Sequence, residues 1–216
     1  MDQDLFVARH GETEWNRDRR MQGRGDAPLT ERGRAQARQL AAFAKGHHVR
    51  RVIASPLGRA RLTAGLIAEA AGASLAFDDD LMEVDFGEAG GLRQEDIDAR
   101  WPDLMARREA DKWHERWPGG ESYADLEARV RGFLARTELG ADTLLLAHET
   151  LNRVMLVSLG AATPDEVLAS KQPADVVLRV RPLEHLDLRA EPRWRPGLFD
   201  PLASITPARR AEATPR

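Results

Sequence analysis

The chain of 216 residues contains no cysteine. This absence excludes disulfide bonds, a cysteine nucleophile and metal sites built from thiolates. Long apolar runs are also absent, and no segment approaches the roughly 20 residues that a membrane-spanning helix needs. A net charge of -3 provides no basic field for nucleic acid and no polybasic stretch for a membrane surface. We therefore expect neither a nucleic acid nor a membrane as a partner.

The N-terminal segment lacks the pattern of a secretory signal. Asp2 and Asp4 stand where a signal peptide carries positive charge, and the apolar run Leu5 to Ala8 is too short for its hydrophobic region. We therefore expect a cytoplasmic protein. A hydrophobic content of 42% over this length is typical of one domain with a single sizeable core.

Strand patterns alternate with helix patterns along the chain. The first half predicts buried strands over 5–8 and 51–54 and a helix over 30–46. Ser55 and Pro56 predict an N-cap and the first residue of a helix that ends near Gly72. The second half predicts a helix capped by Ser122, a strand over 143–147, a helix over 150–159, and two strands over 174–180 and 183–188. This alternation favours an α/β domain with a largely parallel sheet.

The domain organisation follows from shifts in composition. We expect a single domain over 1–190, with an insertion of loops and short helices at about 78–121 that is rich in charge and tryptophan. A Pro/Arg-rich tail covers 191–216; Trp194, Leu198 and Phe199 are expected to anchor its first half, and its end to be disordered. An antiparallel edge near Val176 to Val180 leaves open a homodimer paired through that strand.

Three polar clusters are predicted to follow the ends of strands. They are Arg9-His10, the segment Ser55 to Arg59, and His148. Ligands of open α/β sheets bind outside the carboxyl ends of the strands. We therefore expect these clusters to converge on one site.

The residue types of these clusters suit a phosphate group. Arg9 and Arg59 offer forked donors that keep their charge, and Arg59 falls in the first turn of a helix, where free amides favour an anion. A neutral histidine is a nucleophile, and His10 is the candidate; His148 could stabilise charge on the transferring oxygens.

A leaving oxygen also needs a proton donor. We assign Glu83 to this role, with Asp85 and Glu88 as rivals close by in the sequence. Burial and a bound phosphate would raise its pKa and the two arginines would lower it, so its protonation state stays open at this point.

A longer motif joins these residues. Arg9 to Asn16 reads RHGETEWN and resembles the RHGETxWN signature of the histidine phosphatase family, also called the phosphoglycerate mutase-like family. Further matches follow in order, namely Gln22-Gly23, Pro28-Leu29-Thr30 with Gly33, Ser55-Pro56-Leu57 with Arg59-Ala60 and Thr63-Ala64, Leu81, Glu83, Phe86-Gly87, and His148 with Arg153. The resemblance covers about Leu5 to Leu159.

This resemblance implies a three-layer α/β/α fold with a mainly parallel sheet. It implies a phosphate pocket formed by Arg9, His10, Arg59 and His148, with His10 phosphorylated and Glu83 the proton donor. It places Asn16, Gln22 and Gly23 around the substrate or the phosphate. It implies no metal ion and no organic cofactor.

Two positions depart from the family pattern. Glu149 stands where the family usually has glycine after its second histidine, and its carboxylate either points away from the pocket or alters it. Glu88 to Gly91 replaces a region where phosphatases of the family commonly carry a Trp-Glu pair. Substrate selectivity is therefore expected to depend on the insertion, from about Leu92 to Glu121.

The leading interpretation is a metal-independent phosphatase acting on a small phosphorylated metabolite. The alternatives are a phosphoglycerate mutase, which returns the phosphoryl group to a second hydroxyl, and a non-catalytic phosphate-binding protein whose tail recruits a partner. A metal site at His10, Glu12 and Glu14 is disfavoured because further ligands are lacking. The remaining histidines are interpreted as solvated, namely His47, His48, His114 and His185.

Overall fold

The computed structural model describes residues 4–140, 142–180, 182–190 and 193–199. Its centre is a sheet with strand order β3-β2-β4-β1-β5-β6-β7. The strands are β1 (Leu5–Arg9), β2 (Arg51–Ala54), β3 (Ser74–Phe77), β4 (Thr143–Ala147), β5 (Val176–Arg179), β6 (Glu184–Asp187) and β7 (Arg195–Pro196). Strands β1 to β4 run parallel, and β5, β6 and β7 add antiparallel pairs beyond β1.

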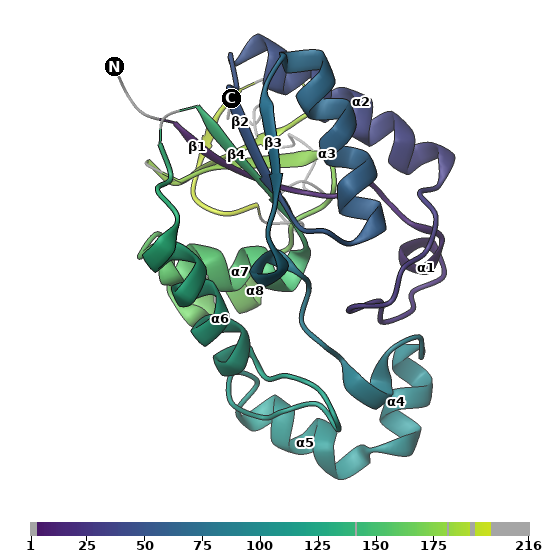
Figure 1. Cartoon of the computed structure of the whole chain (residues 1–216). Helices are drawn as coiled ribbons and strands as arrows, with labels where there is room; N and C mark the ends of the chain where they lie inside the picture. The colour runs from purple at the N-terminus through teal and green to yellow at the C-terminus, as the bar shows by residue number, and fades with distance from the viewer. Residues whose placement is uncertain (1–3, 141, 181, 191–192, 200–216) are drawn as a thin grey trace, which may run out of the picture.

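Helices cover both faces of this sheet. They are α1 (Glu14–Arg17), α2 (Glu31–Gly46), α3 (Gly58–Ala71), α4 (Gln94–Arg100), α5 (Pro102–Ala110), α6 (Tyr123–Arg136), α7 (Glu149–Ser158) and α8 (Pro164–Ala169), with 3-10 turns η1 (Asp79–Leu81) and η2 (Gly87–Ala89). Figure 1 shows α2 and α3 on one side of the sheet and α6, α7 and α8 on the other. The expected three-layer α/β/α fold is thereby confirmed.

The two faces of each central strand feed two separate cores. Val7 and Leu145 pack with α6 and α7, whereas Phe6, Leu144 and Leu146 pack with α2 and α3. This is the alternation of a pleated strand buried on both sides, which is why the runs at 5–8 and 143–147 are continuously apolar. None of the described helices is long and apolar enough to cross a membrane.

The segment 78–120 carries the short helices expected of it. Ala89, Ile97, Leu104 and Trp117 form a small core of their own there. In Figure 1 α4 and α5 lie away from the sheet, beyond the ends of its strands. The first half of the C-terminal stretch packs as expected, because Trp194, Leu198 and Phe199 contact the two main cores. The stretch from 200 to 216 lies outside the described residues.

Several local predictions were wrong. Ser55 is not the N-cap of α3; its hydroxyl accepts the Leu57 N–H at 3.3 Å, and Leu57 occupies the cap position before Gly58. Strands β3 and β7 were not predicted. Strand β5 is not an edge, since it lies between β1 and β6, and the edges of the sheet are β3 and β7. His185 is buried rather than solvated, at 9% exposure against Phe199.

The loop after β1 is held by a close approach of two backbones. A Cβ on Gly11 would lie 2.2 Å from the Gly33 carbonyl oxygen, and a Cβ on Gly33 would lie 2.0 Å from the carbonyl oxygen of Glu12. The Thr30 N–H donates to that same Glu12 carbonyl at 2.9 Å. The first turn of α2 therefore supports the segment that follows His10, and only glycine fits at both positions.

We expect Gly33→Ala to lower the free energy of unfolding by about 2 kcal/mol or more, because the added methyl group meets backbone that cannot rotate away. Gly65→Ala in the interior of α3 is the matched control. Nothing lies within 4 Å of a Cβ at that position. It should stabilise the protein by about 0.5 to 1 kcal/mol. Urea unfolding of both variants checks this, and equal stability would contradict the close approach.

Candidate active site

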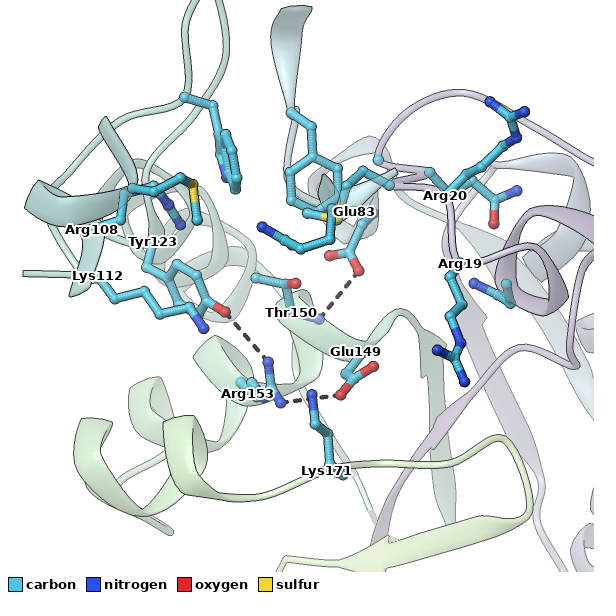
Figure 2. Close-up of a pocket in the computed structure, with 18 of the residues that line it drawn as sticks. Arg19, Arg20, Glu83, Arg108, Lys112, Tyr123, Glu149, Thr150, Arg153 and Lys171 are labelled. Atoms are coloured by element: carbon cyan, nitrogen blue, oxygen red, sulfur yellow. Dashed lines mark hydrogen bonds and ion pairs between the residues drawn. The ribbon is translucent and has the colours of Figure 1, made fainter. Parts of the chain in front are cut away.

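The predicted site residues meet at the carboxyl ends of the parallel strands. His10 follows β1, His148 follows β4, and Arg59 lies in the first turn of α3 after β2. A pocket of about 1100 Å³ opens there (Figure 2). All of the predicted site residues except His148 line this pocket. They are Arg9, His10, Asn16, Gln22, Gly23, Arg59 and Glu83. His148 lies just beneath, fully buried, with its ring centroid 5.0 Å from that of His10.

The His10 imidazole is fixed through both of its nitrogens. Nδ1 lies 2.7 Å from the Gly11 carbonyl oxygen, an acceptor, so Nδ1 carries the proton. Nε2 therefore holds the lone pair, and it accepts the Nε–H of Arg59 at 3.1 Å. Burial, with the charges of Arg59 and Arg9, lowers the pKa of His10 well below its usual value. The ring is thus neutral, with its nucleophilic nitrogen toward Arg59.

The His148 ring has no hydrogen-bond partner on either nitrogen among the described residues. Burial, together with the charges of Arg59 and neighbouring groups, lowers the pKa of His148 well below its usual value. A buried polar group without a partner costs about 1–3 kcal/mol. A ligand oxygen between the two imidazoles would remove that cost.

The Arg59 guanidinium binds the loop that faces it. It donates to the carbonyl oxygens of Gly23 at 2.6 Å and Gly25 at 2.7 Å, and it lies 3.4 Å from the Asp26 carboxylate. Only 2% of the residue is exposed. Arg59 therefore ties the loop 23–26 to His10, and much of its donor capacity is already used.

Glu83 is the one of the three carboxylate candidates that lines the pocket. Its oxygens accept the N–H groups of Thr150 at 3.2 Å and Leu151 at 3.0 Å, in the first turn of α7. Burial raises the pKa of Glu83 in spite of these bonds and of the charges of Arg59 and Arg9. Its rivals are engaged elsewhere: Asp85 accepts the Gly87 N–H, and Glu88 pairs with Arg100 in solvent.

The three residues proposed to surround the substrate differ in what they offer. Gln22 accepts the Thr13 hydroxyl at 2.8 Å, and its buried Nε2 has no partner among the described residues. Asn16 lines the pocket but also accepts the Thr13 N–H at 3.1 Å as part of the capping box of α1. Gly23 has φ +52° and presents its carbonyl oxygen to Arg59. Gln22 is thus the member of this set with a buried donor that has no partner among the described residues.

Glu149 points into the pocket, which decides between the two orientations left open by the sequence. Its two oxygens bridge Arg9, at 2.7 Å, and Arg153, at 3.1 Å. Burial by itself would raise the pKa of Glu149, but Arg9, Arg153 and Lys171 lower it. The carboxylate is therefore ionised and its charge is met on both sides.

Other lining residues escaped the sequence reasoning. Lys112, Lys171, Arg108, Tyr123 and Thr150 all line the pocket. They come from α5 and the segment after it, from α6 and α7, and from the segment after α8. No motif or strand end marks them apart from the position of Thr150 two residues after His148. Within the described residues, no group of three or more histidine or acidic side chains is placed to hold a metal ion.

A neutral, oriented imidazole thus lies beside a second imidazole, among arginines and a buried carboxyl group, at the strand ends of an α/β scaffold. The chain belongs to the histidine phosphatase superfamily (branch 1), whose model matches residues 5–182.

Named relatives fall on both sides of the division between phosphatases and mutases. A "Probable phosphoglycerate mutase GpmB" of Salmonella choleraesuis is 39% identical over 153 residues, covering 67% of this chain and 68% of the relative. The mycobacterial glucosyl-3-phosphoglycerate phosphatase structure is 28% identical, with a TM-score of 0.73, covering 92% of this chain and 98% of that one. The alpha-ribazole phosphatase of Shigella flexneri, 23% identical over 81% of this chain and 89% of its own, supports the fold with a TM-score of 0.72.

Glu149→Gln tests the bridge between Arg9 and Arg153. Because the folded-state pKa of Glu149 is lowered, its carboxylate contributes stability above the unfolded-state value of about 4.3 and loses it as the pH falls through the folded-state pKa. We expect the variant to be less stable than the parent by about 1 kcal/mol at pH 7. Urea unfolding between pH 7 and pH 3 should show this difference shrinking.

Glu88→Gln is the matched control. It removes a carboxylate whose partner, Arg100, is half exposed. Its effect should be much smaller at every pH. A Glu149→Gln effect that is independent of pH would show that the charge of the bridge is not what stabilises the pocket.

Proposed function

We propose that this protein hydrolyses small phosphomonoesters through a covalent phosphohistidine at His10, without a metal ion or an organic cofactor. The observation that carries the proposal is the bond of His10 Nδ1 to the Gly11 carbonyl, which leaves the lone pair on Nε2 at the pocket. A histidine held in this tautomer is a ready nucleophile. Membership of the superfamily and the phosphatase among the similar structures support the same reaction.

In the first step Nε2 of His10 attacks phosphorus as the bond to the ester oxygen breaks. The leaving oxygen takes the proton of Glu83, whose raised pKa makes the acid form easier to populate. In the free pocket the Nε–H of Arg59 donates a hydrogen bond to Nε2 of His10. Once Nε2 bonds to phosphorus, the same N–H donates to a phosphoryl oxygen instead. His148 and the free amide of Gln22 supply further donors to the oxygens of the transition state.

In the second step water breaks the phosphohistidine. The Glu83 carboxylate accepts a proton from the water, whose oxygen attacks phosphorus while the P–N bond electrons return to Nε2. Inorganic phosphate leaves and His10 regains its neutral form. The low pKa of His10 makes it a good leaving group in this step, because a nitrogen that binds a proton weakly also releases a phosphoryl group readily.

A mutase is the second candidate, favoured by the name of the GpmB relatives. It would use the same first step, but the phosphoryl group would return to a second hydroxyl of the substrate instead of to water. The two reactions differ in what they release, so one assay separates them.

We expect phosphate release from a panel of small phosphomonoesters, including 3-phosphoglycerate and glucosyl-3-phosphoglycerate, to persist in the presence of a chelator. His10→Ala should lose activity by about 10³-fold or more. His114→Ala, which removes an exposed imidazole paired with Asp111, is the control and should retain full activity. Rapid conversion of 3-phosphoglycerate to 2-phosphoglycerate with little phosphate release would favour the mutase instead. Phosphate binding without either reaction would point to a non-catalytic protein.

The role of Glu83 predicts a particular pH dependence. Since the acid form is needed to protonate the leaving group, the ratio of kcat/KM between the parent and Glu83→Gln should fall as the pH rises through the raised pKa of Glu83. With an alkyl phosphate the variant should lose about 10² to 10³-fold at the acidic end. With p-nitrophenyl phosphate, whose leaving group needs no proton, the loss in the first step should be much smaller. Equal losses with both substrates would exclude Glu83 as the proton donor.

A further inference from the structure

The pocket holds more positive charge than one phosphate group requires. Its lining contains eight cationic side chains and four carboxylates, in a chain whose net charge is -3. Arg9, Arg59 and the two histidines already account for a site for the transferred phosphate. The remaining cations gather elsewhere on the lining, and charge concentrated in a cleft attracts anionic ligands.

Lys112 and Lys171 are the clearest members of this surplus. Lys112 follows α5 and Lys171 follows α8, and both reach the pocket from distant parts of the sequence. Across the described parts of the chain, neither ammonium group forms a hydrogen bond or ion pair with another residue. Partial burial, followed by the charges of Arg153, Arg108 and Lys171, lowers the pKa of Lys112, and the Glu149 carboxylate acts in the opposite direction.

Arg153 gives the group a rigid centre. It is 8% exposed and donates to the Ser170 carbonyl at 2.6 Å and to the Tyr123 hydroxyl at 3.4 Å. The same guanidinium holds one oxygen of Glu149, whose other oxygen is on Arg9. Arg9, on the side of the proposed phosphate site, and Arg153 are thus separated by a single carboxylate group, that of Glu149.

Figure 2 shows how these groups are arranged. Lys112, Arg153 and Lys171 gather around the side of Glu149 that faces away from Arg19. Among the described residues, the carboxylates Asp98 and Glu109 also line the pocket, from α4 and α5, but neither forms an ion pair with the two lysines. Both ammonium groups act on the Glu149 carboxylate at longer range, but neither is held by an ion pair among the described residues, so each can still meet a ligand.

We propose that Lys112, Arg153 and Lys171 form a second anion subsite, which selects phosphomonoesters carrying a further carboxylate or phosphate on a short carbon skeleton. This inference rests on the proposed phosphatase function and narrows its substrate class. Arg153 already donates to the Glu149 carboxylate, and the two lysine ammonium groups offer the charge that a ligand carboxylate or phosphate needs. The short separation between Arg9 and Arg153 sets the size of the skeleton.

Three matched substrates test the subsite. Glycerol 3-phosphate has no second anion, 3-phosphoglycerate has a carboxylate, and 1,3-propanediol bisphosphate has a second phosphate. We expect the parent to favour the last two over glycerol 3-phosphate by roughly tenfold or more in kcat/KM. In the Lys112→Gln, Lys171→Gln double variant this preference should fall to near one through a higher KM for the two substrates that carry a second anion, and kcat/KM for glycerol 3-phosphate should change much less. Lys45→Gln, at the exposed end of α2, is the control and should keep the preference.

Binding separates failure of the subsite from failure of the chemistry. Calorimetry on His10→Ala measures affinity for 3-phosphoglycerate and glycerol 3-phosphate without turnover, and the same tenfold difference is expected, again lost on adding the two lysine substitutions. Equal affinity or equal kcat/KM for the three substrates would overturn the subsite while leaving the phosphatase intact. A preference that survives in the double variant would overturn it as well. A preference in binding with no phosphate release from any substrate would support the subsite and overturn the phosphatase.

Discussion

Keeping one imidazole neutral beside guanidinium groups is the constraint on which the site depends. His10 is only 3% exposed, and two arginines make its protonation still more costly. The Gly11 carbonyl then decides which nitrogen keeps the single proton. Every neighbouring feature serves this state: Arg59 is tied to the carbonyls of the loop 23–26, and the backbone after His10 rests on the first turn of α2. A histidine in water would share its proton between the two nitrogens and between two charge states.

A pocket built from so many cations would repel itself without an internal anion. Of the four carboxylates on the lining, Glu149 is the one that pairs with two of these cations at once, because it lies between Arg9 and Arg153 and is held ionised by both. The residue that departs most visibly from the family pattern is therefore part of the electrostatic balance of the pocket and does not block it. Glu149 also separates Arg9, on the side of His10, from Arg153, Lys112 and Lys171 on its other side.

Much of this architecture could be predicted from the sequence, for physical reasons that vary along the chain. Strands β1, β2 and β4 are buried on both faces, so their runs are continuously apolar, and the polar residues after them mark the site. Strand β3 carries no such signal because it pairs only with β2 and its residues 74–76 are exposed. The cap of α3 was misplaced because Ser55 bonds two residues ahead, inside a turn that precedes the helix. Lys112 and Lys171 could not be found, since only the folded chain brings their two segments to one pocket.

The register of the central strands has a consequence for how the site is assembled. Strand β4 lies between β1 and β2. Its Thr143 pairs with Leu5, although most of the sequence of the domain lies between these two residues. Contacts between residues so far apart in sequence are slow to form, because a long loop must close before they bring any gain. During synthesis the His10 segment emerges first and must wait, without its neighbouring strand, until β4 has left the ribosome. His10 and His148 therefore come together only after β4 has paired with β1, and a chain that stops before β4 lacks the strand that carries His148 to the pocket.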